Sequence, residues 1–366
     1  MGFADYLGNE KIVTALRGML RRGRVPHAML FGGPRGVGKY TLAVQFAQAA
    51  NCQRLADDAC GECAACAAIG QLLNPAPLIE RGLEERGANP DAATVERIPL
   101  LLQTHPDVTV AVPDPVRAKN PAARPVIRMG QLRAIQRAAY FKPQARRRVF
   151  IVDGADTMRY DFANVFLKVL EEPPESATLI LLAPNPYALL TTIQSRCVRF
   201  FFAPVPAEKV EAALARRSDL KPAERKLAAQ LSAGSLGAAL TLDLEESGRL
   251  RREALRILEM GAAGRPLTAL FAATQQLAKN EKESFEKLLE LFYSLLSDLL
   301  ELSHGPVSSA LRNPDLQREI AALSSLASLD WILRATLAVD ELQGRLRRNI
   351  NRQLGLDNVA LGLARN

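Results

Sequence analysis

Short apolar segments alternate with helical stretches over the first 203 or so residues of the chain. After the first apolar segment, residues 41–50 place Leu42, Phe46 and Ala49 on one side of a helix. The apolar segments are nearly continuous, which is typical of parallel strands covered on both faces. We therefore predict an α/β domain with strands at residues 27–31, 148–153, 178–183 and 198–202.

The pattern changes after residue 203. Pro204 and Pro206 predict a hinge, because proline stops a helix and a central strand. A small helical region follows to about residue 244, and from residue 249 onward no strand pattern occurs, whereas residues 285–302 read as a long helix. Residues 74–104 are rich in proline, glycine and charge and predict a surface insertion. We expect three domains, at 1–203, 204–244 and 245–366.

Composition narrows the class of protein. A chain of 366 residues exceeds what one hydrophobic core usually serves. It contains no apolar run long enough to span a bilayer, and its beginning does not resemble a signal peptide, so we expect a cytoplasmic protein with no membrane partner. The net charge of +8 and arginine clusters at 21–24, 146–148 and 345–348 are compatible with nucleic acid as a neighbour. Solvated helix faces are the favoured explanation of any one such cluster, so charge alone decides nothing.

A glycine-rich segment follows the first predicted strand. Gly33, Pro34, Gly36, Gly38 and Lys39 form the pattern G-x4-G-K between a strand and a helix, which is the setting of a phosphate-binding loop. The backbone N–H groups would surround phosphates, and Lys39 would reach the outer ones. A turn that is retained without nucleotide remains the alternative, so ATP or ADP binding stays open.

The residues that hydrolysis needs beside this loop are incomplete. Tyr40 stands where a serine or threonine hydroxyl normally holds magnesium, and Thr41 is one position too far along the helix to replace it. Asp153 ends a predicted buried strand and is the Walker B candidate, but Gly154 follows it where a water-orienting glutamate is expected. Asp156 is better placed to line the next turn. We expect no ATP turnover by this chain alone.

Four cysteines form the pattern Cys52-x7-Cys60-x2-Cys63-x2-Cys66 directly after the loop helix. Four thiolates at this spacing suit a tetrahedral zinc ion in a closed, structural site. The cluster alone leaves an iron–sulfur centre or unligated buried thiols as alternatives. Cys197 is left over, and we expect it to be packed in the core.

Two further segments carry a resemblance to a known family. Residues 164–174, NVFLKVLEEPP, resemble the LLK-x-LEEPP helix end of clamp loaders, and Ser195-Arg196-Cys197 resembles their SRC motif. With the cysteine cluster and the segment at 349–354, they make the chain similar to the AAA+ clamp-loader subunits of bacterial DNA polymerase III. The resemblance implies an α/β P-loop (AAA+) domain with a zinc-binding module at about 52–66, a small helical lid domain and an all-α C-terminal collar. It also favours zinc at the cysteines.

Departures from the active subunits favour the delta-prime class within this family. Ala183-Pro184-Asn185 replaces the polar γ-phosphate sensor of tau and gamma, and residues 234–237 carry glycine where those subunits carry the sensor arginine. The resemblance then implies a subunit that works with delta and three tau or gamma copies. Such a complex opens the sliding clamp and places it on primed DNA.

Arg196 is the candidate catalytic residue. The resemblance makes it an arginine finger that acts in trans, since a guanidinium supplied across an interface stabilises charge on the transferring γ-phosphate. A surface arginine or a structural ion pair is the alternative role for this residue. For the chain, the alternatives are an active tau- or gamma-like ATPase and a zinc-bearing DNA-binding module.

Overall fold

A computed structural model describes residues 2–115, 125–158, 160–172, 174–216, 219–279, 285–303, 311–345 and 351–364. The chain divides into two compact units, Met1–Lys209 with Gly234–Gly237, and Val210–Ala233 with Ala238–Asn366. Each unit has a hydrophobic core of its own. The finer separation of a lid at 204–244 from a collar at 245–366 stays a prediction.

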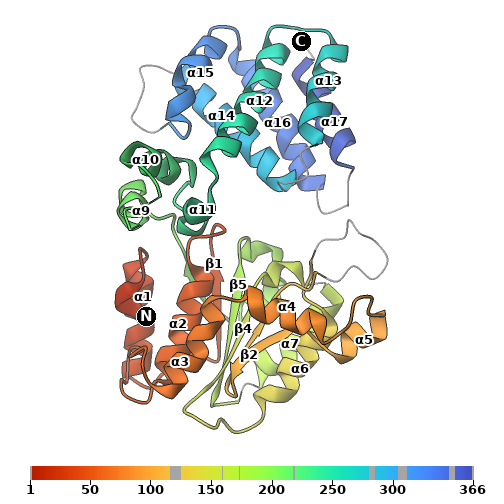
Figure 1. The fold of residues 1–366 in the computed structure, drawn as a ribbon. Coiled ribbons are helices and arrows are strands. Elements are labelled where there is room, and N and C mark those ends of the chain that lie inside the picture. The colour runs from red at the N-terminus through yellow and green to blue at the C-terminus, as the bar shows by residue number, and fades with distance from the viewer. Residues whose placement is uncertain are drawn as a thin grey trace. The chain divides into compact units, whose positions relative to one another are not determined.

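The first unit is built on a six-stranded sheet with the order β2-β3-β4-β5-β1-β6. Four of its strands, β1, β2, β4 and β5, are labelled in Figure 1. β1 is parallel to β5 and β6, β4 is parallel to β3 and β5, and β2 alone is antiparallel, to β3. The four strands expected from the sequence are confirmed as β1, β4, β5 and β6. The strands are β1 Ala28–Gly32, β2 Leu101–His105, β3 Val108–Ala111, β4 Arg148–Val152, β5 Ala177–Ala183 and β6 Val198–Phe201.

Alternate residues of the buried strands face two separate parts of the core. Met29 and Phe31 of β1 belong to one cluster, together with apolar residues of α1, α2 and α3. Ala28 and Leu30 belong to the other, together with α6, α7 and α8. Helices therefore cover both faces of the sheet, which explains why the strands are apolar throughout.

The helices of this unit connect the strands. They are η1 Phe3–Asp5, α1 Glu10–Arg21, α2 Lys39–Asn51, α3 Ala64–Gly70, η2 Gln71–Leu73, α4 Ala76–Glu84, α5 Ala92–Arg97, α6 Met129–Ala139, η3 Ala155–Thr157, α7 Tyr160–Glu171, η4 Pro186–Ala188 and α8 Thr191–Gln194. α2 contains the helix predicted at 41–50 and begins directly after the glycine-rich segment. Its residues from Leu42 to Asn51 are all buried.

The segment 74–104, predicted as a surface insertion, is partly integrated into the first unit. It contains α4 and α5, and its last four residues belong to β2, which pairs with β3 at the edge of the sheet. The buried side chain of Arg86 donates to the carboxylate of Asp114 at 2.7 Å and to the carbonyl oxygen of Ile98 at 2.7 Å. The charge-assisted bond to Asp114 ties the segment to the rest of the first unit, whereas the bond to Ile98 joins two parts of the segment itself.

The second unit contains helices joined by loops and, among its described residues, no strand, as expected. The helix predicted at 285–302 is confirmed as α14, and one core cluster draws on α12 to α17. The helices are α9 Ala207–Leu214, α10 Pro222–Leu231, α11 Leu236–Thr241, α12 Leu244–Ala262, α13 Leu267–Ala278, α14 Phe285–Ser303, η5 Pro314–Leu316, α15 Gln317–Ser324, α16 Leu329–Arg345 and α17 Arg352–Ala364, of which α9 and α11 begin in the first unit.

Across the described ranges, the helices are too short or too polar to cross a membrane. Some residues singled out in the sequence lie outside those ranges. They are Pro173 of the LEEPP segment, Arg347 and Arg348 of the last basic cluster, and the start of the segment at 349–354.

Candidate functional site

The glycine-rich loop joins β1 to α2 at the carboxyl edge of the sheet. Gly38 has a φ of +93° and directly precedes the helix, and a Cβ on it would lie 2.7 Å from the hydroxyl oxygen of Tyr6. Only glycine meets both the left-handed backbone and the close approach without strain. The loop therefore requires glycine at this position.

Lys39 occupies the loop in this structure. Its Nζ donates hydrogen bonds to the carbonyl oxygens of Gly33 at 2.6 Å and Pro34 at 2.5 Å. Burial lowers the pKa of Lys39 to about 8, while the charges of Asp153 and Asp156 act in the opposite direction. A phosphate would have to draw the ammonium group away from both carbonyl oxygens.

Two segments outside the loop also bind it. The hydroxyl of Tyr6 donates to the carbonyl oxygen of Val37 at 3.1 Å. The backbone N–H of Gly237 donates to the carbonyl oxygen of Gly36 at 3.2 Å. No local pattern in the sequence indicates either contact, and both bind the loop to other segments of the first unit.

Tyr40 uses its hydroxyl elsewhere. The phenol donates to the carbonyl oxygen of Leu72 at 2.8 Å, and the ring packs against the core cluster that contains α2. Burial raises the pKa of Tyr40, so the group stays neutral. Thr41 is partly buried one position further along α2. The structure thus gives Tyr40 a packing role beside the loop, in keeping with its poor fit to magnesium.

Asp153 directly follows β4, as a Walker B aspartate does. Its Oδ1 accepts the N–H of Gly154 at 3.0 Å. Burial raises the pKa of Asp153, opposed by that N–H group and by the charge of Lys39. The structure brings Asp153 and Lys39 into electrostatic range of each other.

Gly154 adopts a conformation that a glutamate would strain. Its φ is +64°, and a Cβ at this position would lie 2.7 Å from Cγ of Pro113. The backbone of this turn therefore suits glycine. A glutamate here would require a change in the backbone or in its contact with Pro113, as well as a new side chain.

The four clustered cysteines come together as one group. Their Sγ atoms all lie within 4.8 Å of one another, and three of the four side chains are buried. Tetrahedral zinc with Zn–S bonds of about 2.3 Å places its sulfur ligands about 3.8 Å apart, so this donor set fits such an ion. The cluster can hold a metal through Cys52, Cys60, Cys63 and Cys66.

Backbone groups already favour thiolate at part of this cluster. The N–H of Cys63 donates to Sγ of Cys60 at 3.3 Å, and the N–H of Cys66 donates to Sγ of Cys63 at 3.5 Å. The N–H groups of Cys63 and Glu62 lower the pKa of Cys60 to about 6, whereas burial raises that of Cys66 to about 12. A bound cation would relieve the cost of the buried charge.

Arg196 lies at the amino ends of the parallel strands, which we call the amino edge, opposite the carboxyl edge where the glycine-rich loop lies. It precedes the amino end of β6, whereas the phosphate loop follows the carboxyl end of the parallel strand β1. Its Nη1 donates to the carbonyl oxygen of Thr192 at 3.0 Å, and its Nη2 donates to Oε1 of Glu171 at 2.9 Å. The side chain is 35% exposed. Arg196 is therefore placed away from the loop of its own chain, and the neighbouring Cys197 is buried as expected.

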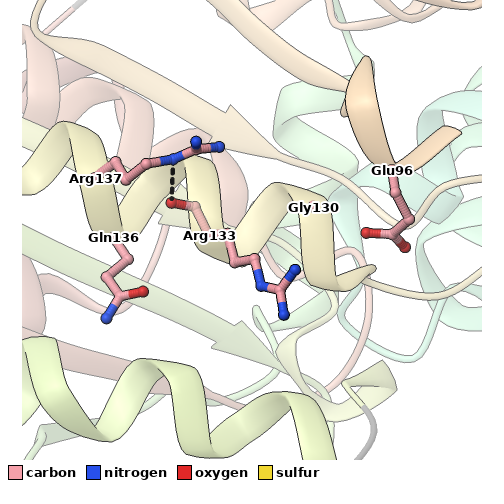
Figure 2. Close-up of a pocket in the computed structure, with 5 residues that line it drawn as sticks. All are labelled: Glu96, Gly130, Arg133, Gln136 and Arg137. Carbon is pink, nitrogen blue, oxygen red and sulfur yellow. Dashed lines mark hydrogen bonds between the residues drawn. The ribbon is translucent and has the colours of Figure 1, made fainter. Parts of the chain in front are cut away.

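A separate cavity of about 350 Å³ lies on α5 and α6 (Figure 2). Nε of Arg137 donates to the carbonyl oxygen of Arg133 at 3.4 Å, and Glu96 lies across from these residues in Figure 2. The cavity shares no residue with the phosphate loop or the cysteine cluster, so it does not change the choice of site. It is lined by Glu96, Gly130, Arg133, Gln136 and Arg137.

Two family models match the chain. One described as "DNA polymerase III, delta subunit" matches residues 8–206, which is more than half of the chain. One described as "DNA polymerase III, delta subunit, C terminal" matches residues 251–364. The two matches cover the α/β region and the helical region separately.

Individual relatives agree. Subunit tau of DNA polymerase III from Bacillus subtilis is 27% identical over 79% of this chain, but the chain spans only 46% of that protein. It spans less still of the next tau or gamma relatives, 23% and 31%. DNA polymerase III subunit delta' from Bacillus subtilis is 23% identical over 96% of this chain and 95% of its own length.

Among solved structures, a gamma subunit-related protein from Thermotoga maritima is 18% identical. The TM-score is 0.38, and the alignment covers 96% of this chain and 98% of that one. No function follows from a likeness at that level. The family matches, together with the relative of nearly equal length, show that the chain belongs to the DNA polymerase III delta-subunit family of clamp-loader proteins.

Proposed function

We propose that this chain is the delta-prime subunit of a DNA polymerase III clamp loader. In this proposal it donates Arg196 to ATP held by a neighbouring tau or gamma subunit and does not hydrolyse ATP itself. It works with tau or gamma and delta in the cytoplasm, and it reaches the sliding clamp and primed DNA through the assembled complex. The relative of nearly equal length, a delta' subunit, supports the choice within the family.

The placement of Arg196 carries the proposal. The guanidinium is partly exposed at the amino edge of the sheet, and the phosphate loop lies at the carboxyl edge. Arginine has five N–H donors. Two of them make the bonds to Thr192 and Glu171, which are the hydrogen bonds of the Arg196 side chain among the described residues, and three stay available. An arginine so placed suits a phosphate on another subunit.

The chemistry asked of Arg196 is electrostatic. Negative charge spreads over the γ-phosphate oxygens during transfer, and a planar guanidinium can contact two of them at once. Such a finger typically raises the rate by a thousandfold or more. Lysine carries the charge without the planar fork, so it should replace arginine poorly.

The loop of this chain is proposed to be a scaffold. The phenol of Tyr40 is bonded to Leu72, and Gly154 has no carboxylate to orient water. These features argue against an active tau- or gamma-like ATPase. Nucleotide that binds the loop would stay intact, and the cysteine cluster would hold structural zinc beside α2.

The test is the ATPase activity of the assembled loader with Arg196→Ala. We expect the variant to fold and assemble, and ATP hydrolysis stimulated by clamp and DNA to fall incompletely, because the other subunit interfaces keep their own fingers. Unchanged hydrolysis by a fully assembled variant loader would contradict the proposed function.

A further inference from the structure

Glu171 and Arg196 form an ion pair at the amino edge of the sheet. Nη2 of Arg196 lies 2.9 Å from Oε1 of Glu171, and the two side chains are 35% and 51% exposed. Glu171 is the last residue of α7, and Arg196 follows α8 by two positions. The pair therefore joins the LEEPP segment to the SRC segment, a contact that no local pattern in the sequence indicates.

The guanidinium is fixed from two sides. The carbonyl oxygen of Thr192, one helical turn earlier, accepts from Nη1, and Glu171 accepts from Nη2. Ser195 is bonded to the same carbonyl oxygen at 3.2 Å, which keeps this turn closed. A free arginine side chain samples many rotamers, and holding it in one removes an entropic cost that would otherwise fall at the moment of reaction.

We propose that Glu171 is a positioning residue for Arg196. Its carboxylate holds the guanidinium in one orientation, so that the remaining N–H groups meet the γ-phosphate of ATP on the neighbouring subunit without a search among rotamers. This inference rests on the proposed function of Arg196. Glu171 itself does not touch the phosphate, where its charge would be repelled.

The exposure of the pair makes this role separable from folding. Exposed ion pairs contribute little to protein stability, so Glu171→Ala should unfold at nearly the temperature of the unaltered chain. Its effect should appear in the partner's rate. Glu172 is a matched control: it is the next residue, its side chain is exposed, and no hydrogen bond of that side chain occurs among the described residues.

The experiment measures ATP hydrolysis by the assembled loader. The corresponding arginines of the other subunits are replaced by alanine, so that Arg196 is the finger that remains. Glu171→Ala should lower kcat about two- to fivefold, the range open to an exposed ion pair, and leave KM for ATP unchanged because the neighbour binds the nucleotide. Glu171→Gln, which keeps an oxygen acceptor, should recover most of the rate, and Glu172→Ala should change neither constant.

A double variant separates positioning from an independent effect. Glu171→Ala combined with Arg196→Ala should hydrolyse no more slowly than Arg196→Ala alone, because Glu171 acts through Arg196. Losses that multiply, or a kcat that is unchanged or raised by Glu171→Ala, would overturn the positioning role. If Arg196→Ala itself leaves kcat unchanged, the proposed function fails; if only Glu171→Ala does, the inference alone fails.

Discussion

The glycine-rich loop at the carboxyl edge of the sheet and Arg196 at its amino edge use their polar groups differently. At the carboxyl edge, the loop retains its shape, but Lys39 is bonded to the carbonyl oxygens of Gly33 and Pro34, and the phenol of Tyr40 to that of Leu72. At the amino edge, Arg196 is bonded twice and remains partly exposed. The polar groups of Lys39 and Tyr40 are thus bonded within the chain, whereas the guanidinium of Arg196 keeps N–H donors available.

In the proposed function, this chain keeps the fold of the first unit but does not hydrolyse ATP. The packing of the strands and α2 depends on apolar residues such as Phe31 and Phe46. Hydrolysis depends on a few polar groups at strand ends, and these can change while the core stays intact. A subunit can then stop hydrolysing ATP and still serve its neighbour.

The largest expected effect concerns the cysteine cluster. Its disruption should affect the helices beside the glycine-rich loop and leave the region of Arg196 unchanged. Replacing Cys63 and Cys66 by serine should abolish the binding of about one zinc ion per chain and unfold the local module, because metal binding and folding are coupled there. Elemental analysis and amide hydrogen exchange check this. We expect faster exchange in α3, which packs on α2, and little change in β6.

The fifth cysteine supplies a control. Cys197 is buried outside the cluster, so Cys197→Ser should leave the zinc content unchanged. Purified protein that lacks zinc, or a double serine variant with the exchange pattern of the unaltered chain, would refute the metal assignment.

The next effect concerns repair of the carboxyl edge. Gly154→Glu restores the residue expected in active relatives, but we expect a loss of about 2–4 kcal/mol in the free energy of unfolding, since left-handed backbone and contact with Pro113 both oppose it. ATP turnover should stay absent. Chemical denaturation and a steady-state ATPase assay measure the two outcomes.

Gly23 is a matched control for this change. Its φ is +64°, as at Gly154, but no atom lies within 4 Å of an added Cβ. Gly23→Glu should therefore lower the free energy of unfolding by about 1 kcal/mol, because only the left-handed backbone opposes the substitution. Our account would be contradicted if the Gly154→Glu variant hydrolysed ATP and the further change Lys39→Ala abolished that activity. The single substitution would then be enough to make the loop an active site.

The smallest effect concerns the buried charge of Lys39. Its pKa is lowered from 10.5 to about 8 by burial, so between these values the unfolded chain binds a proton that the folded chain does not. Stability contributed at this site therefore rises with pH. The free energy of unfolding of the unaltered chain, relative to Lys39→Met, should rise by about 2–3 kcal/mol between pH 8 and 10.5. A flat difference would mean that Lys39 is solvated and not enclosed by the loop.

Much of the first unit could be predicted from its sequence because its strands are apolar and its turns carry glycine. The strands β1, β4, β5 and β6, the phosphate loop and the grouping of the four cysteines all follow local patterns. The hairpin of β2 and β3 could not be predicted, because both strands are short and in β2 the apolar Leu101 and Leu102 are followed by consecutive polar residues, so β2 shows neither an apolar run nor an alternation. The segment before it therefore looked like a surface insertion.

The contacts that decide what the site can do were harder to predict. Tyr6 and Val37 are 31 residues apart, and Glu171 and Arg196 are 25 apart. No local period joins such residues, since their meeting depends on how helices pack across the sheet. The sequence identified Arg196 and Lys39 by motif, but it could not show that the first stays partly available and the second is bonded to its own loop.

The most direct test of the account is single-turnover ATP hydrolysis by a loader in which Arg196 is the remaining finger. Arg196→Ala should slow the chemical step by about a thousandfold with unchanged assembly, zinc content and melting temperature, and Arg196→Lys should recover little. Arg199→Ala removes an exposed arginine three residues away and should have little effect. A variant that hydrolyses ATP at the unaltered rate, or that fails to assemble because the first unit is destabilised, would contradict a finger that acts in trans.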